Sequence, residues 1–260
     1  MPYVTTTIDQ RGVATVTLDN PDKHNAFDDN IIGELSRTFN AVNANRDVRI
    51  MVLASTGKSF SAGGDLDWMK RMAGYSREEN FADAQTLAAM FKTLNFMTKP
   101  TIARVQGAAF GGAVGLISCC DMAVATEQAV FSLSEARIGL IPATISPYVI
   151  AAIGQRAARR YFTTAERFDA FEALKLDLVS QLVSSPDALD DAVAQLVDQL
   201  LRCSPAAVAA AKQLVFDMDR DITDPLIAET CKRIADIRVS PQGQEGLAAF
   251  LQKRQPGWAQ

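Results

Sequence analysis

The stretch KPTIARVQGAAFGGAVGLISCCD, residues Lys99 to Asp121, decides the fold. A short β-like apolar run, Thr101 to Val105, is separated by glycines from a second apolar segment. Glycine tolerates a tight backbone and lets a ligand approach closely, so the pattern predicts a strand, a glycine turn and a buried helix. A helix that begins near Gly111 would point free N–H groups, and the positive end of its dipole, at the turn. The turn is therefore a candidate site for an anionic oxygen.

The segments around this stretch predict an α/β fold. Alternating residues in Tyr3–Ile8 and Val13–Leu18 indicate a hairpin, and the apolar run Arg49–Ala54 indicates a buried strand. Helical periodicity dominates the C-terminal part of the chain. Strands that alternate with helices, followed by a run of helices, favour an α/β core over residues 1–195 and a C-terminal helical region over residues 196–260.

Further elements follow from local patterns. We expect helices after an N-cap at Asp28 or Asp29, over Leu66–Met72 with Asp65 as the cap, and through most of Ser76–Met97. Short strands are expected at 122–125 and 130–133, and a helix that runs to Ile153 is expected to be followed by another from Gly154. The C-terminal helices are predicted at 187–201, 205–218, 226–237 and 242–253.

Composition narrows the class of protein. Of 260 residues, 48% are hydrophobic and 22% charged, and the net charge is −4, which gives no general attraction to nucleic acid or to an anionic membrane. No charged-then-apolar signal segment opens the chain, and the apolar run from Val105 to Asp121 is too short for a membrane span. The four cysteines do not suggest a disulfide framework. They indicate reduced core residues of a cytoplasmic protein.

A single histidine, His24, limits the chemistry. Histidine-rich metal sites are nearly excluded, and any Ser-His or Cys-His catalysis would have to use that residue. The motifs GxSxG, HExxH and CxxC are absent from the sequence. We therefore expect no metal site.

Three motifs carry a resemblance to a known family. They are FSAGGDL at Phe60–Leu66, VQGAAFGGAVGL at Val105–Leu116 and SEARIGLIPATI at Ser134–Ile145. In this order and spacing they resemble the enoyl-CoA hydratase/isomerase (crotonase) family, and the resemblance covers essentially the whole chain. It implies a crotonase-like core, a superhelix of ββα units, with a C-terminal helical trimerisation region.

The resemblance also implies a catalytic arrangement. Two backbone N–H groups, which correspond to Gly64 and Gly112, would bind the oxygen of a coenzyme A thioester. Fixed donors of this kind stabilise the negative charge that develops when a proton leaves or joins the α-carbon. Hydratases of the family place two glutamates beside the double bond. The matching positions here are Gly115 and Glu135, so only Glu135 is expected to move a proton.

Binding of coenzyme A would fall to other matched positions. The resemblance suggests Lys58 and Lys253 for the phosphates, Phe250 for the adenine, and backbone atoms of the loop Lys23–Phe27. The substrate-binding residues that it implies are Lys23, Asn25, Ala26, Lys58, Ala62, Asp65, Leu66, Trp68, Phe250 and Lys253. The C-terminal pair would come from a neighbouring subunit of a homotrimer or a dimer of trimers. No cofactor is expected, because coenzyme A is part of the substrate.

Three functions stay open on the sequence. The first is reversible hydration of a 2-enoyl-CoA in fatty acid or amino-acid catabolism. For this function, the segment SEARIGLIPATISPYVIAAIG is similar to hydratases of the branched, methylglutaconyl-CoA type. The second is Δ3-Δ2 isomerisation of an enoyl-CoA, which needs only one proton shuttle and suits a single glutamate. The third is an acyl-CoA-binding subunit without turnover, an alternative that Gly115 keeps open.

Overall fold

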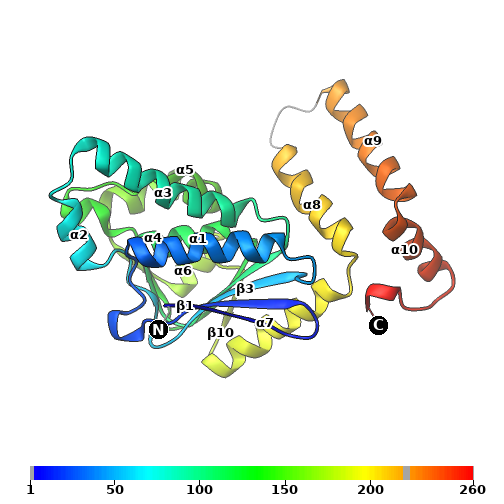
Figure 1. Ribbon diagram of the computed structural model, residues 1–260, viewed down its shortest axis with the longest axis horizontal. Coiled ribbons are helices and arrows are strands. Elements are labelled where there is room, and N and C mark those ends of the chain that lie inside the picture. Colours follow the sequence, from blue (N-terminus) through cyan, green and yellow to red (C-terminus); the bar gives the residue numbers. More distant parts are fainter. Residues whose placement is uncertain (1–2, 219–222, 260) are drawn as a thin grey trace.

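Two sheets form the centre of the protein in a computed structural model that describes residues 3–218 and 223–259 (Figure 1). The larger sheet has the strand order β1-β2-β3-β5-β7-β10 and the smaller one has the order β4-β6-β8-β9. Among the strand pairs of the described residues, β1–β2 and β8–β9 alone are antiparallel. The strands are β1 (Val4–Ile8), β2 (Val13–Leu18), β3 (Ile50–Ser55), β4 (Ser59–Ser61), β5 (Thr101–Val105), β6 (Ala108–Phe110), β7 (Met122–Thr126), β8 (Val130–Ser132), β9 (Arg167–Asp169) and β10 (Gln181–Val183).

The chain alternates between the sheets. It runs from β3 to β4, from β5 to β6 and from β7 to β8, so each turn adds one strand to each sheet. The helices are α1 (Asp29–Ala44), α2 (Leu66–Met72), α3 (Arg77–Asn95), α4 (Gly112–Cys119), α5 (Ser146–Thr164), α6 (Ala170–Lys175), α7 (Pro186–Leu201), α8 (Pro205–Asp217), α9 (Asp224–Val239) and α10 (Pro241–Leu251), with 3-10 helices η1 (Pro21–Lys23), η2 (Ser134–Ile138) and η3 (Gly257–Ala259). This is the predicted superhelix of ββα units.

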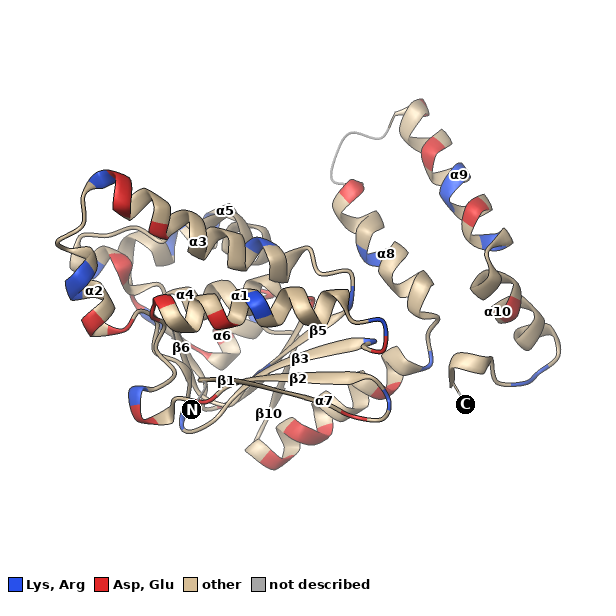
Figure 2. Cartoon of the chain, viewed as in Figure 1, with Lys and Arg blue, Asp and Glu red and all other residues tan. Residues whose placement is uncertain are grey.

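Helices cover both faces of the larger sheet. The main hydrophobic cluster joins the sheets to α1, α3, α4 and α5, and a second cluster joins the opposite face to α7. Figure 1 shows α1 and α3 on one side of the strands and α7 on the other. The glycine-rich helix α4 contains no charged residue, whereas Figure 2 shows charged residues on α3 and α9. Helix α4 lies inside the main hydrophobic cluster. A charged side chain there would be buried without water, which is why the helix contains none.

Most predicted elements are confirmed. The hairpin has the register Val4↔Leu18, and the N-cap side chains of Asp28, Asp65 and Ser76 accept hydrogen bonds from the first turns of α1, α2 and α3. The expected break between two helices at Gly154 is a kink inside α5, where the glycine has φ 75° and ψ 158°. Its positive φ is a conformation that glycine adopts without steric cost.

The smaller sheet was only partly predicted. Strand β6 lies inside what the sequence predicts as a turn, and β4 and β9 each have only three residues, as does β10 at the edge of the larger sheet. Short strands carry too few alternating residues for a periodic pattern to show. Pairing with neighbouring strands stabilises them here: β6 lies between β4 and β8.

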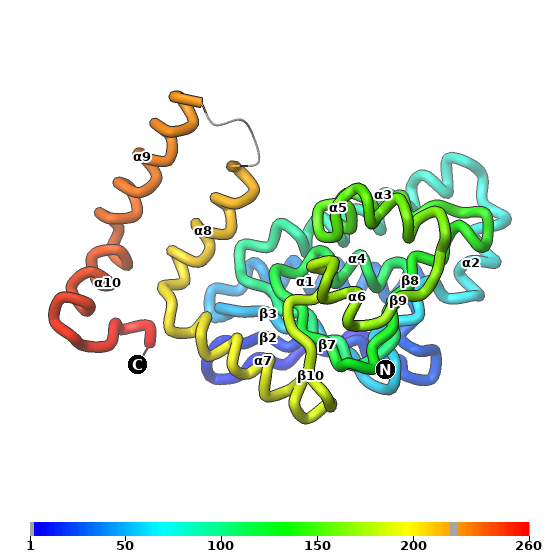
Figure 3. Tube along the Cα trace, turned by 180° about the vertical axis from the view of Figure 1, so that it is seen from behind, coloured from blue at the N-terminus to red at the C-terminus, as the bar shows by residue number. Residues whose placement is uncertain are grey.

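The C-terminal helices α8, α9 and α10 extend away from the sheets as an arm (Figures 1 and 3). The expected boundary between residues 195 and 196 falls inside α7, which packs on the core through Val197. The arm therefore begins after Leu201. Its contacts with the core include the Lys212–Asp121 ion pair at 2.8 Å and the Phe96–Phe216 ring pair.

A second anchor of the arm is Arg49. Its guanidinium donates hydrogen bonds to the carbonyls of Leu201, Cys203 and Trp258, at 2.9 to 3.1 Å. These acceptors belong to the end of α7, the hinge after it and the C-terminal η3. One side chain thus ties both ends of the arm to the start of β3.

Other expectations can be compared with the structure directly. No helix in the described ranges is long and apolar enough to cross a membrane. All four cysteines are free, but only Cys119 is buried; Cys120 is half-buried, and Cys203 and Cys231 are exposed. The prediction that the cysteines are core residues is therefore wrong for the last two, which lie on the arm side of the chain.

Candidate active site

The first half of the candidate site is the turn before α4. Gly111 is the N-cap of α4, with φ 53° and ψ −119°, and its amide donates to the carbonyl of Ser132 at 2.9 Å. Gly112 is the first helical residue, and such residues have no intrahelical partner for their N–H groups. Within the described residues the Gly112 amide donates no hydrogen bond to the protein. It is one free donor at the positive end of a helix dipole.

The second half is the loop before α2. Phe27 and Gly64 form an isolated parallel bridge, in which the Phe27 amide donates to Gly63 and its carbonyl accepts from Asp65, both at 2.7 Å. The backbone groups that pair with Phe27 thus belong to Gly63 and Asp65, the residues on either side of Gly64. In the part of the chain that the structure describes, the Gly64 amide has no protein acceptor. A second free donor is therefore held in place by its neighbours.

Phe27 connects the two halves. Its backbone pairs around Gly64, while its ring lies so close to Gly112 that a β-carbon there would be 2.8 Å from Cε2. Gly63 similarly lies against the carbonyl of Phe110, because a β-carbon at position 63 would be 3.0 Å from that oxygen. Both glycine motifs thus meet at one place. Gly64 and Gly112 therefore lie on either side of Phe27.

Glu135, in η2, places its carboxyl group beside this turn. Its Oε1 would be 3.1 Å from a β-carbon at Gly111, so any side chain there would press on the carboxylate. Oε2 is buried, and no group among the described residues hydrogen-bonds to it. Burial raises the pKa of the Glu135 carboxyl above its ordinary value. A carboxyl group of this kind can take up and release a proton closer to neutral pH.

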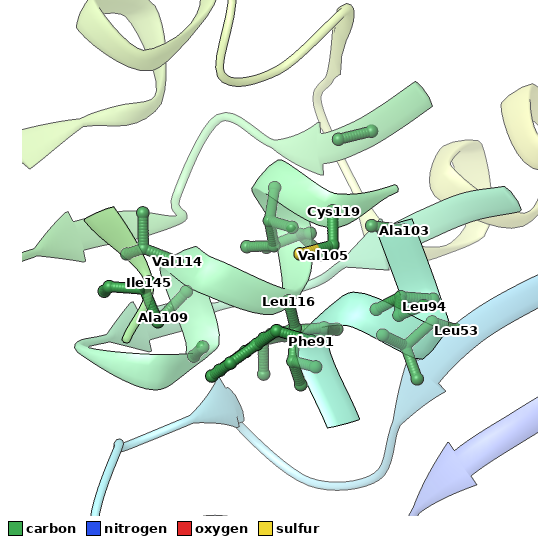
Figure 4. Packing of buried hydrophobic residues seen from close by; sticks show 14 of the residues in the cluster. Leu53, Phe91, Leu94, Ala103, Val105, Ala109, Val114, Leu116, Cys119 and Ile145 are labelled. Atoms are coloured by element: carbon green, nitrogen blue, oxygen red, sulfur yellow. The ribbon is translucent and has the colours of Figure 1, made fainter. Parts of the chain in front are cut away.

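The space next to Gly115 contains apolar side chains. A β-carbon at Gly115 would be 2.3 Å from Cγ2 of Ile145 and 3.1 Å from Cε1 of Phe91. Ile145 is 2% exposed and Phe91 is fully buried. Figure 4 shows Ile145 and Phe91 among the side chains packed around α4. The position that would carry the other glutamate of a two-glutamate site is thus closed by packing.

Lys23 and Asp65, both expected to contact the substrate, bind each other. Nζ of Lys23 is 2.9 Å from Oδ2 of Asp65 and 3.7 Å from Asp67, and this pairing raises the pKa of Lys23 and lowers that of Asp65. The other carboxylate oxygen of Asp65 accepts from the amides of Asp67 and Trp68. Asp65 is therefore already engaged in capping α2 and pairing with Lys23.

Other predicted binding residues hold the loops. The side chain of Asn25 is buried and donates to the carbonyls of Thr56 and Ser59, while the Ala62 amide donates to His24. The side-chain amide of Asn25 is thus already engaged within the protein, and contact of this loop with a ligand through backbone atoms stays a prediction. Ala26 is also buried, whereas Lys58 is exposed.

The first turn of α2 presents two different surfaces. Trp68 is 5% exposed, and its indole N–H lies 3.4 Å from a carboxylate oxygen of Asp83. Leu66 is instead 71% exposed. Met69 lies next to Gly64, because a β-carbon there would be 3.5 Å from its Cγ and Sδ atoms. Met69 and Trp68 together bound the Gly64 side of the site.

Phe250 and Lys253 do not join the site of their own chain. Both are exposed at the end of α10, and Phe250 keeps 81% of its surface accessible. Figures 1 and 3 place α10 and α2 at opposite ends of the chain.

The sequence did not predict the contact of Gly111 with Glu135, or those of Phe91 and Ile145 with Gly115. A signal for Gly111 was present, since two adjacent glycines before an apolar helix indicate a special backbone conformation. Phe91 and Ile145 come from distant segments and look like ordinary core residues. In the described ranges, no group of three or more His, Cys, Asp or Glu side chains is placed to hold a metal ion.

Comparison with known proteins agrees with this geometry. The sequence profile of the family described as enoyl-CoA hydratase/isomerase matches residues 9–260. A crystal structure of an enoyl-CoA hydratase from Shewanella pealeana is 49% identical with a TM-score of 0.95, covering 98% of this chain and 96% of that one. An enoyl-CoA hydratase from Mycobacterium smegmatis is 32% identical with a TM-score of 0.93, covering 100% of both chains. The 2,3-dehydroadipyl-CoA hydratase of Escherichia coli is 29% identical over 95% of each chain.

The fold and the paired glycine turns define a crotonase-fold enzyme. The chain belongs to the enoyl-CoA hydratase/isomerase family.

Proposed function

We propose that the protein catalyses the reversible addition of water to a 2-enoyl-CoA thioester. The observation that supports this most directly is the carboxyl group of Glu135, which lies against Gly111, next to the free amide of Gly112, and whose Oε2 is buried without a partner among the described residues. The amides would hold the thioester oxygen as it gains negative charge, and one such donor contributes roughly 3 kcal/mol to a transition state. Glu135 would transfer the proton. Relatives that are named enoyl-CoA hydratase support the same reaction.

The reaction needs no separate cofactor in this proposal, because the thioester itself makes the α-carbon acidic. Lys23, Lys58 and the backbone of Asn25 and Ala26 would contact coenzyme A. Phe250 and Lys253 would reach the site only from a neighbouring subunit, since α10 lies far from α2 in the same chain. We therefore propose a homotrimer or a dimer of trimers as the active assembly.

The acyl group is proposed to be branched, of the methylglutaconyl type. Support comes from the segment Ser134–Gly154, which resembles hydratases of this type. The relative that acts on 2,3-dehydroadipyl-CoA shows that an acyl group with a second carboxylate occurs among similar proteins. A cytoplasmic location stays a prediction.

Isomerisation of a 3-enoyl-CoA is the second candidate. The observation that favours it is the apolar packing at Gly115, because isomerisation needs a single proton shuttle. A subunit that binds acyl-CoA without turnover is disfavoured by the position of Glu135, whose carboxyl group lies against Gly111 with Oε2 buried and without a partner among the described residues.

A substrate panel tests the proposal. Straight, branched and dicarboxylic 2-enoyl-CoAs are incubated with the protein, and loss of the thioester-conjugated absorbance is followed. We expect hydration of at least one of them, with a branched substrate preferred. Loss of absorbance with none of them, together with isomerisation of a 3-enoyl-CoA, would replace hydration by the second candidate. Binding with neither reaction would support the third.

A further inference from the structure

The packing around α4 bears on how many proton-transferring groups the site contains. Phe91 touches both glycines on one face of α4: its Cζ would be 3.8 Å from a β-carbon at Gly112, and its Cε1 would be 3.1 Å from one at Gly115. Residues three apart lie on the same side of a helix. The face of α4 that contains Gly112 and Gly115 is therefore covered by apolar side chains. These are Phe91 and Ile145, and neither has a titratable group.

The other charged groups near the turn are already engaged or lie elsewhere. Asp65 is paired with Lys23 and bound by two amides, as described above. Asp83 is turned to the indole of Trp68. Glu135, in contrast, has one oxygen against Gly111 and one that is buried without a partner.

We infer that Glu135 alone performs both proton transfers of the hydration, because Ile145 and Phe91 exclude a second carboxylate. The inference rests on the proposed function and specifies its mechanism. In the first transfer, the carboxylate accepts a proton from water while the water oxygen bonds to the β-carbon. The π electrons of the double bond move to the thioester oxygen, which is held by the two amides. In the second transfer, Glu135 returns that proton to the α-carbon and is a carboxylate again.

Two consequences separate this mechanism from one with two carboxylates. In this mechanism Glu135 both takes the proton from water and delivers it to the α-carbon. A change in Glu135 must therefore slow both proton transfers. With two groups, hydration would still need both, but α-proton exchange would depend only on the group beside the α-carbon. Exchange of α-protons in a saturated acyl-CoA measures the second step alone, because a saturated thioester cannot be hydrated.

The experiment compares wild-type protein with Glu135→Gln and Glu135→Asp. Hydration of the best enoyl-CoA is measured by absorbance, and α-proton exchange of its saturated analogue in D₂O is measured by mass spectrometry. Glu135→Gln should lower both rates by a similar factor, of roughly 10² to 10⁴. Glu135→Asp, which keeps the carboxylate, should restore part of both. Glu127→Gln, at an exposed glutamate, serves as the control with unchanged rates.

Binding of the saturated acyl-CoA and far-ultraviolet circular dichroism show that each variant is folded. Survival of α-proton exchange in Glu135→Gln, with hydration lost, would overturn the inference by revealing a second base. Survival of hydration would overturn it as well. If wild-type protein hydrates no enoyl-CoA, the proposed function itself fails, and this outcome is distinct because it appears before any variant is made.

Discussion

The Cγ2 methyl of Ile145 lies where the side chain of residue 115 would begin, 2.3 Å from the ideal β-carbon position of Gly115. The two residues belong to different elements, since Gly115 is inside α4 and Ile145 is the N-cap of α5. Their fit closes the space beside the oxyanion turn. It also explains why a helix that is otherwise apolar carries a glycine at a position where glycine weakens helices.

The first prediction concerns this fit. Gly115→Ala should lower the free energy of unfolding by about 1–3 kcal/mol, because the new methyl group overpacks the core. Gly33→Ala is the matched control in α1, where the nearest atom is the mobile end of Arg37 at 3.4 Å. There alanine should stabilise the protein by up to about 1 kcal/mol. Urea unfolding measures both. Equal stability of the two variants would show that Ile145 moves aside freely.

The second prediction compares the two oxyanion glycines. A methyl group at Gly112 would strike the ring of Phe27 at 2.8 Å, whereas at Gly64 it would make ordinary contacts of 3.5 Å with Met69. Displacement of a fixed donor weakens transition-state stabilisation. Gly112→Ala should therefore reduce kcat by about tenfold or more, and Gly64→Ala by much less. Steady-state kinetics with the preferred enoyl-CoA give both values; the reverse order would contradict the placement of Phe27.

The third prediction is the pH dependence of activity. Burial raises the pKa of Glu135, and hydration starts from its carboxylate form, so activity is present above this raised pKa and lost as the pH falls through it. Dehydration also starts from the carboxylate. Both directions should show an acidic limb with a midpoint above 4.5 and no basic limb from a second acid.

The surroundings of Glu135 bear on this profile. Its own η2 also contains Arg137, and the helices that follow the two motifs contain Cys119 in α4 and Tyr148 in α5. No charged neighbour contributes to the shift of the Glu135 pKa, which burial dominates. A bell-shaped kcat/KM profile in both directions would indicate a second acid–base group and contradict the single-carboxylate site.

The fourth prediction concerns the arm. Arg49→Met removes three hydrogen bonds to carbonyls, and bonds from charged groups are worth about 1.5–3 kcal/mol each. The C-terminal segment should then open at least about tenfold more often, which limited trypsin digestion after Lys253 and Arg254 would report. Arg46→Met, at an exposed neighbour, is the control. Equal digestion of both variants would show that Arg49 does not hold the arm.

Features that depend on residues close together in the sequence were predicted, whereas contacts between distant segments were not. Caps such as Asp65 and the start of α4 depend on neighbours in the chain, so local patterns identified them. Gly64 and Gly112 were paired through resemblance, and the structure shows that Phe27 joins them. The packing of Ile145 against Gly115 links segments about thirty residues apart, and no periodicity marks it. The internal engagement of Asp65 with Lys23 was likewise not visible, because both residues looked like ligand-binding groups.

The central claim is most directly tested by the initial rate of enoyl-CoA hydration in wild-type protein and in Glu135→Gln, each at saturating substrate. We predict that wild-type protein removes the conjugated absorbance and forms the 3-hydroxyacyl-CoA. The variant should lose roughly 10² to 10⁴ in rate while its affinity for a saturated acyl-CoA stays within a few fold. A Glu135→Gln variant that hydrates as fast as wild-type protein, or a wild-type protein inert toward every enoyl-CoA, would contradict the account.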